Sequence, residues 1–181
     1  MNETPLPSKV LIGPKKSLCA DSGNNRLFWV PGDKVRTIVE AFDAYLADRF
    51  PNEEQESMAF GEYVSRLLRA MHGKLRQSRG SDAEVKRMLE APGIFEIRWH
   101  WNVMEHGLRK FIGARLFHRE ISEGRKLVAA RLMCKKGDID QLATHYKQTG
   151  FAKDADWAIR HSDETQWNEV LRSDLEMPSD E

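Results

Sequence analysis

The sequence predicts an α+β fold with N-terminal helices, a three-stranded antiparallel sheet at about residues 94–134, and C-terminal helices. The stretch Phe95–Trp101 places apolar side chains at every second position, which is the period of a strand buried on one face. Two more runs of strand-like composition follow, Lys110–His118 and Lys126–Cys134. The turn-rich Ser122–Gly124 separates these two, so an antiparallel meander is expected, with Asn102–Arg109 as its first loop.

Helical periodicity surrounds this sheet on both sides. Apolar residues recur at three- and four-residue spacing between Asp33 and Phe50, and again after the capping residue Asn52. The spacing of Ser81 and Glu84 resembles a capping box. The further helices expected are Asp82–Glu90, a helix capped at Asp138 that stops near Gly150, and two pieces at Asp154–His161 and Glu164–Leu175.

The chain divides into three parts by composition. Residues 1–32 read as an N-terminal extension, with a hairpin expected between Val10–Ile12 and Leu27–Val30. Residues 33–161 form the single α+β domain, and residues 162–181 form an acidic C-terminal helix and tail.

The cysteines and the apolar runs limit the cellular setting. Cys19 and Cys134 are far apart and follow no paired spacing, so neither a disulfide nor a structural zinc site is expected. No apolar run reaches the roughly 20 residues of a membrane span. The sequence therefore predicts a cytoplasmic protein without membrane attachment, metal or cofactor.

Charge is unevenly distributed along a chain whose formal net charge is zero. Residues 1–61 carry 7 basic and 9 acidic side chains, residues 62–136 carry 17 and 8, and residues 137–181 carry 4 and 11. The basic middle favours a polyanionic partner, and the acidic end can compete for the same surface. Pairing of these charges across the folded domain is the alternative.

The segment Gly93–Arg98 resembles the opening of the sheet in the RelE/HigB-type toxin family and its phage-derived relatives. In that family a glycine, an apolar pair, a glutamate and an arginine begin the sheet, a second strand carries an arginine, and a third runs into paired lysines. Arg115 and Lys135-Lys136 occupy the matching positions here. The similarity spans roughly residues 82–161, and the family fold is expected with it.

The resemblance implies an mRNA endonuclease, free or ribosome-dependent, with RNA or the ribosome and an antitoxin or host protein as partners. Metal-independent RNA cleavage needs a base for the 2′-hydroxyl, cations for the charge on phosphorus and an acid for the leaving oxygen. His100 or His118 can move protons near neutral pH. The catalytic candidates are Arg98, Arg115, Lys135, Lys136 and His100; the nucleic-acid-binding candidates are Arg66, Arg69, Lys74, Arg76 and Arg131.

Each candidate also has an ordinary structural explanation. Arg98 and Glu96 can form ion pairs on the strand face, Lys135-Lys136 can be a solvated strand end, and His100 can be a packing residue. The alternative function is a non-enzymatic binding or inhibitory protein, encoded by a phage or mobile element, that docks through its segregated charge.

Overall fold

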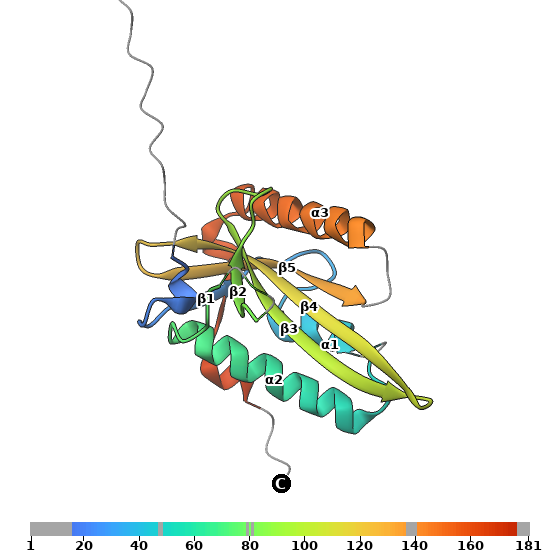
Figure 1. The fold of residues 1–181 in the computed structure, drawn as a ribbon. Helices are drawn as coiled ribbons and strands as arrows, with labels where there is room; N and C mark the ends of the chain where they lie inside the picture. The colour runs from blue at the N-terminus through green and yellow to red at the C-terminus, as the bar shows by residue number, and fades with distance from the viewer. Residues whose placement is uncertain (1–15, 47–48, 79, 81, 137–140, 177–181) are drawn as a thin grey trace, which may run out of the picture.

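A mixed six-stranded sheet forms the centre of the protein in the computed structural model (Figure 1). The structure describes residues 16–46, 49–78, 80, 82–136 and 141–176, with the backbone alone described at residues 136 and 141–144. The strand order is β2-β3-β4-β5-β1-β6. The strands are β1 Arg26–Trp29, β2 Val85–Arg87, β3 Ile94–Glu105, β4 Leu108–Ile121, β5 Lys126–Lys136 and β6 Asn168–Val170.

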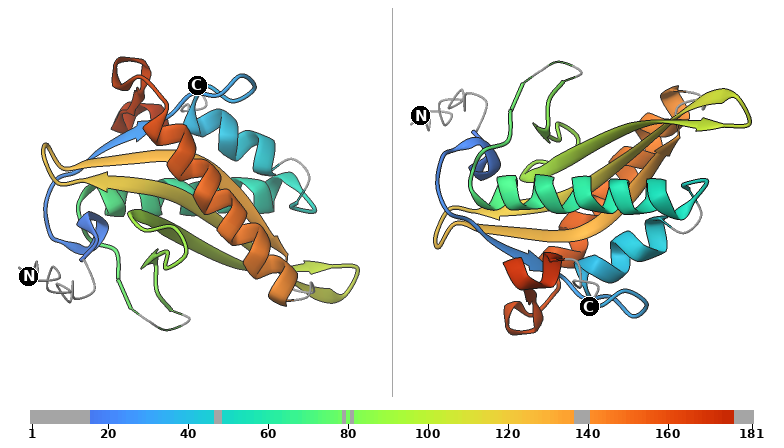
Figure 2. Two further views of the ribbon diagram at one scale, coloured as in Figure 1. Left: turned by 90° about the horizontal axis from the view of Figure 1, so that it is seen from above. Right: turned by 90° about the horizontal axis from the view of Figure 1, so that it is seen from below.

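Helices cover both faces of this sheet. Helices α1 (Ile38–Leu46) and α2 (Glu53–Met71) lie on one face, and α3 (Gln141–Arg160) crosses the other (Figures 1 and 2). Three short 3-10 helices complete the described elements: η1 Leu18–Ala20, η2 Glu164–Gln166 and η3 Arg172–Leu175. The sheet therefore separates two apolar cores, a larger one under α1 and α2 and a smaller one under α3.

The predicted alternation along β3 is confirmed. Phe95, Ile97, Trp99 and Trp101 are buried in the larger core, while the residues between them face the α3 side. Edge-on aromatic contacts stabilise this arrangement, because the ring of Tyr63 of α2 contacts the rings of both tryptophans at centroid distances of 4.9 and 5.0 Å.

The expected loop at Asn102–Arg109 is wrong, because β3 and β4 continue through it to a tight hairpin turn. Glu105 pairs with Leu108, and the two residues between them have positive φ, 50° at His106 and 75° at Gly107. Positive φ at both central positions matches the right-handed twist of the flanking strands, so the hairpin closes in two residues.

The expected three-stranded antiparallel sheet is also wrong, since three more strands join the meander β3-β4-β5. Leu27–Val30 was expected to pair with Val10–Ile12, which lies outside the described residues; instead β1 pairs in parallel with the first half of β5. On its other side β1 pairs with β6, inside the stretch expected as the helix Glu164–Leu175. These pairings join segments about 100 and about 140 residues apart, which local periodicity does not report.

The expected helix Asp82–Glu90 is replaced by β2, which pairs with β3. Ser81 lies outside the described residues. Glu84 is buried, and Arg69 donates to both of its carboxylate oxygens at 2.6 and 2.9 Å. This long-range ion pair, together with burial of Val85, outweighs the local capping pattern.

Helix α3 is one continuous helix of 20 residues, where a stop near Gly150 and a separate helix at Asp154–His161 were expected. The glycine costs only about 1 kcal/mol in a helix interior. Burial of Ala152, Ala155 and Ile159 in the smaller core offsets that cost.

Among the helices of the described residues, none combines the length and apolar character that crossing a membrane requires.

Candidate nucleic-acid interface

Four of the predicted site residues lie on the α3-side face of the sheet. Arg98 of β3 stands opposite Arg115 of β4. Two residues further along β3, His100 stands opposite Gly113, which in turn pairs with Lys135 of β5. Side chains two positions apart on one strand share a face. The two neighbouring rungs of the sheet, Arg98 opposite Arg115 and His100 opposite Gly113 and Lys135, therefore present their polar groups on the same side.

Arg115 is the buried member of this group. Its side chain is 0% exposed, and its Nη1 atom donates to the carbonyl oxygens of Trp99 and Ala114 at 3.2 and 2.9 Å. Its Nε and Nη2 atoms have no hydrogen-bond partner. Burial, opposed by Glu96, lowers the pKa of Arg115 to about 10, so the guanidinium stays charged at neutral pH. It supplies positive potential from beneath the surface.

A single carboxylate partly balances the two arginines. Glu96 is 2% exposed, and its oxygens lie 3.7 Å from Arg98 Nε and 3.9 Å from Arg115 Nε. The side-chain amide of Gln148, on α3, donates to the same carboxylate. Counting Lys135 as well, three cations and the one carboxylate of Glu96 lie at these positions among the residues that the structure describes, an excess of positive charge.

His100 is the uncharged member of the site. Partial shielding of its ring from water lowers the pKa of His100, and the nearby Arg115, Arg98 and Lys135 lower it further, to about 4. The imidazole is therefore neutral at pH 7 and can accept a proton. Burial and the same two arginines also lower the pKa of Lys135, which makes its ammonium a better proton donor.

Two further residues of this face, Phe111 and Lys86, have no signal in the sequence that points to the site. The ring of Phe111 lies beside Gly113, where an added Cβ would be 3.5 Å from its edge atom Cε1, and its centroid is 5.3 Å from that of His100. Phe111 is half-buried, so one side of an aromatic ring remains available beside the cations. Lys86 of β2 pairs with Glu96 in register and adds to the positive potential at Lys135. The sequence predicted a helix at Asp82–Glu90, so Lys86 was not expected to lie on the sheet.

Of the two other sheet candidates, only the side chain of Arg131 is described, and it lies apart from this group. The side chain of Lys136 lies outside the described residues. Arg131 borders a separate cleft at the edge of β5, where its Nη1 atom donates to the carbonyl oxygen of Ala130 at 2.7 Å.

The candidates on and after α2 surround Glu84 instead. Arg69 forms the close pair already described, Arg66 Nη2 lies 3.7 Å away and Arg76 Nε lies 3.8 Å away. Burial alone would raise the pKa of Glu84, but these arginines and the Arg76 backbone hold it below its ordinary value. Three cations thus anchor the crossing from α2 to β2. Lys74 is exposed, and its carbonyl oxygen accepts from Arg69.

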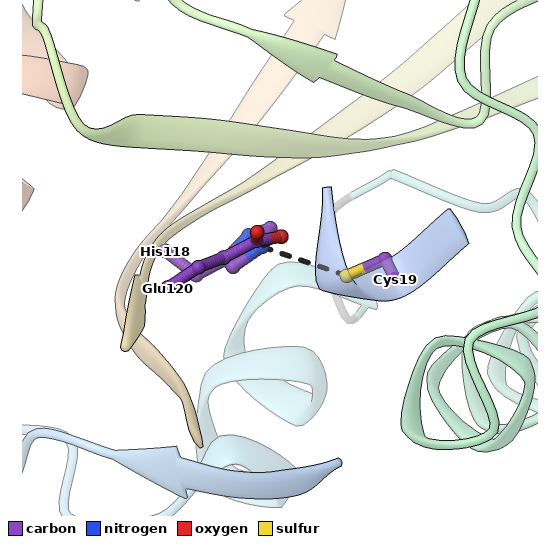
Figure 3. A group of neighbouring side chains, drawn as sticks. All are labelled: Cys19, His118 and Glu120. Atoms are coloured by element: carbon purple, nitrogen blue, oxygen red, sulfur yellow. Dashed lines mark hydrogen bonds and ion pairs between the residues drawn. The ribbon is translucent and has the colours of Figure 1, made fainter. Parts of the chain in front are cut away.

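His118, the second histidine candidate, belongs to a buried cluster on the opposite face of the sheet. Its Nε2 atom lies 3.1 Å from Glu120 Oε1 and 3.6 Å from Cys19 Sγ (Figure 3). Glu120 also accepts from the hydroxyl of Ser17 and, at 2.8 Å, from the backbone amide of Leu18. The cluster therefore ties η1 to β4.

The ligand atoms of Cys19, His118 and Glu120 all lie within 4.8 Å of one another, a spacing that suits Zn²⁺. Metal binding through Nε2 would place the proton of His118 on Nδ1, which is buried without an acceptor. Burial and the nearby Glu120 raise the pKa of the Cys19 thiol well above its ordinary value. These features fit a hydrogen-bonded anchor better than a metal centre or a nucleophile.

Comparisons with family models, with curated proteins and with solved structures found no match to this chain.

Proposed function

We propose that the protein binds RNA on the α3-side face of the sheet and cleaves it with protein groups alone. The observation that carries the proposal is the placement of His100 beside Arg98, Arg115 and Lys135 at two neighbouring positions of the sheet. Arginine and lysine bind phosphate, and a neutral imidazole accepts a hydroxyl proton. RNA supplies both groups, because its 2′-hydroxyl adjoins the phosphate.

The spacing of the site suits one phosphodiester. His100 and Lys135 are separated by one strand at Gly113. Two strand spacings place their Cα atoms roughly 10 Å apart. A phosphate between them has a proton acceptor on one side and a proton donor on the other. Phe111 lies next to this position, where its ring can stack on a base.

The reaction balances without an added reactant. His100 accepts the 2′-hydroxyl proton, and the 2′-oxygen forms a bond to the neighbouring phosphorus. The bond from phosphorus to the 5′-oxygen breaks, and Lys135 Nζ donates a proton to that oxygen. Arg98 and the field of Arg115 stabilise the added negative charge on the phosphate. The products are a 2′,3′-cyclic phosphate and a 5′-hydroxyl.

The test is cleavage of a labelled RNA oligonucleotide in the presence of EDTA. Wild-type protein should yield cyclic-phosphate ends, and an oligonucleotide with 2′-deoxy positions should stay intact. His100→Ala should lower the rate by at least about a hundredfold, the usual contribution of a general base. His161→Ala, one residue past the C-terminal end of α3, is the matched control. Equal cleavage by both variants contradicts the proposal.

The cellular role we propose with this chemistry is that of an mRNA endonuclease from a toxin–antitoxin or phage-derived system. Its support is the resemblance of Gly93–Arg98 and Lys135-Lys136 to the RelE/HigB-type family. Expression of the wild-type chain alone should arrest growth, and Arg98→Ala should relieve the arrest at equal protein level. Growth that continues with soluble wild-type protein contradicts this role.

Full burial of Arg115 favours a second candidate, RNA binding without cleavage. A guanidinium that is 0% exposed cannot touch a bound phosphate unless the site rearranges. Arg115 therefore cannot make the direct phosphate contact that was expected of it. A non-enzymatic inhibitor would bind the RNA and the 2′-deoxy oligonucleotide alike and cleave neither.

A further inference from the structure

A cleft of about 450 Å³ lies beside the second half of β5, away from His100. It opens where β1 leaves the sheet. The parallel pairing of the two strands ends at Trp29 and Ala129, and the amide of Val30 makes a last bond to the carbonyl oxygen of Ala129. The walls are α1, the loop after β1, and α3.

All charged side chains that line this cleft are positive. They are Lys34, Arg49, Arg131 and Lys147. None of the four forms an ion pair with a carboxylate in the part of the chain that the structure describes. Arg49 and Lys147 rest over the rings of Tyr45 and Phe151 at 4.8 and 5.9 Å from the centroids. The cleft thus has apolar walls and unbalanced positive charge.

Its floor is a free strand edge. From Arg131 to Cys134 strand β5 pairs with β4 on one side, and within the described ranges no strand pairs with its other side. These four residues extend over roughly 13 Å at the rise of a β-strand. An unpaired edge presents backbone donors and acceptors that can pair with another extended chain.

We propose that this cleft binds an extended acidic segment of a partner protein, which adds a strand to β5 alongside Arg131–Cys134. Backbone hydrogen bonds to the free edge supply affinity. Acidic side chains of the segment pair with Arg131 and Lys147, and its apolar side chains contact the aromatic walls. The four cations repel basic strands, so charge selects the partner.

A peptide fits these features better than RNA does. An RNA strand would use the positive charge but would leave the edge of β5 unpaired, and the apolar walls favour alternating apolar side chains. The inference does not depend on the proposed RNA site, because no residue of that site lines the cleft.

The test uses a short blocked peptide of alternating glutamate and valine, labelled with fluorescein, and the full chain. Fluorescence anisotropy should detect binding that weakens with salt. Arg131→Glu and Lys147→Glu should each weaken it by about tenfold or more. Lys153→Glu, on the same helix outside the cleft, is the matched control and should bind like wild type. Circular dichroism verifies that each variant is folded.

Three further probes distinguish the outcomes. The same peptide with alternate N-methylated amides should not bind, and binding should slow hydrogen exchange of the Arg131–Cys134 amides. His100→Ala should bind the peptide normally even if RNA activity is lost. Equal affinity for the N-methylated peptide, displacement of the peptide by uridine oligonucleotides at equal concentration, or no binding by the wild-type chain overturns the proposal.

Discussion

Arg98 and Arg115 stand directly opposite each other on β3 and β4, two like charges at a position where sheet neighbours usually attract. The carboxylate that both approach, Glu96, has its oxygens 3.7 and 3.9 Å from their Nε atoms. One anion between two arginines relieves the repulsion only in part. This is the electrostatic origin of the positive face, and it adds to the partial shielding from water that lowers the pKa of His100.

Neutralising Arg115 should raise the pKa of His100. In wild type the pKa of His100 is about 4, and Arg115 is the largest charge acting on it after partial shielding. Arg115→Met should therefore move the His100 titration toward the ordinary value of about 6.5. NMR of the imidazole protons against pH measures this. An unchanged His100 titration would contradict the electrostatic account.

The low pKa of His100 also determines how the stability of the protein changes at acid pH. A folded pKa below the unfolded one means that the unfolded state binds more protons, so stability is lost as pH falls from about 6.5 toward 4. His100→Gln should flatten this part of the stability curve. Urea unfolding between pH 7 and 4 compares the two proteins, and parallel curves would oppose the prediction.

Glu96 and Arg115 should behave as a coupled buried pair. Glu96→Gln leaves the buried guanidinium without a counter-charge and should cost about 3 kcal/mol in the free energy of unfolding. Adding Arg115→Met removes that stranded charge and should restore most of the loss. Chemical denaturation of the single and double variants gives the coupling energy. Additive losses would mean that the pair does not interact.

The anchor at Glu120 should stabilise the fold in a pH-dependent manner. Burial opposes ionisation, but bonds from His118, Ser17 and Leu18 hold the pKa of Glu120 below its ordinary value. The contribution is thus present above about pH 4.3, the unfolded pKa, and is lost as pH falls through the folded one.

Glu120→Ala should cost about 3 kcal/mol at pH 7 because it leaves buried donors unpaired. The loss should shrink on acidification. Glu123→Ala, in the exposed turn after β4, should change stability by less than about 0.5 kcal/mol. Equal effects of the two substitutions in urea unfolding would contradict a stabilising role for the cluster at Glu120.

Phe111→Ala should weaken RNA binding by about tenfold, since stacking on one base contributes roughly 1–3 kcal/mol. Leu108→Ala, at the exposed end of the same hairpin, is the control. Anisotropy with a labelled single-stranded RNA measures both. If the two variants bind alike, Phe111 has no part in the interface.

The central meander was predictable because its signals are local. Alternation in Phe95–Trp101 and the turn after Ile121 need only neighbouring residues, and the same alternation assigns Arg98 and His100 to one face. The strand at Leu27–Val30 was expected, but its pairing with β5 and β6 was not, because these partners are distant in sequence. Strands β2 and β6 lie in stretches whose local capping and periodicity predicted helices.

The candidate site was predictable in part for the same reason. The types of residue and their alternating positions along the strands indicated Arg98, His100, Arg115 and Lys135. The burial of Arg115 and the contact of Phe111 with His100 both depend on tertiary packing, so neither has a sequence signal. Arg66, Arg69 and Arg76 formed a plausible basic stripe until Glu84 proved to lie among them.

The salt dependence of RNA binding tests most directly whether Arg98 and Lys135 form one phosphate site. Each phosphate contact on a single strand contributes a slope of about −0.7 to the logarithm of affinity against that of salt concentration. The double variant Arg98→Gln/Lys135→Gln should reduce the slope by roughly 1.4, while Lys153→Gln/Arg172→Gln should leave it unchanged. A slope that the first pair leaves at the wild-type value would contradict the account.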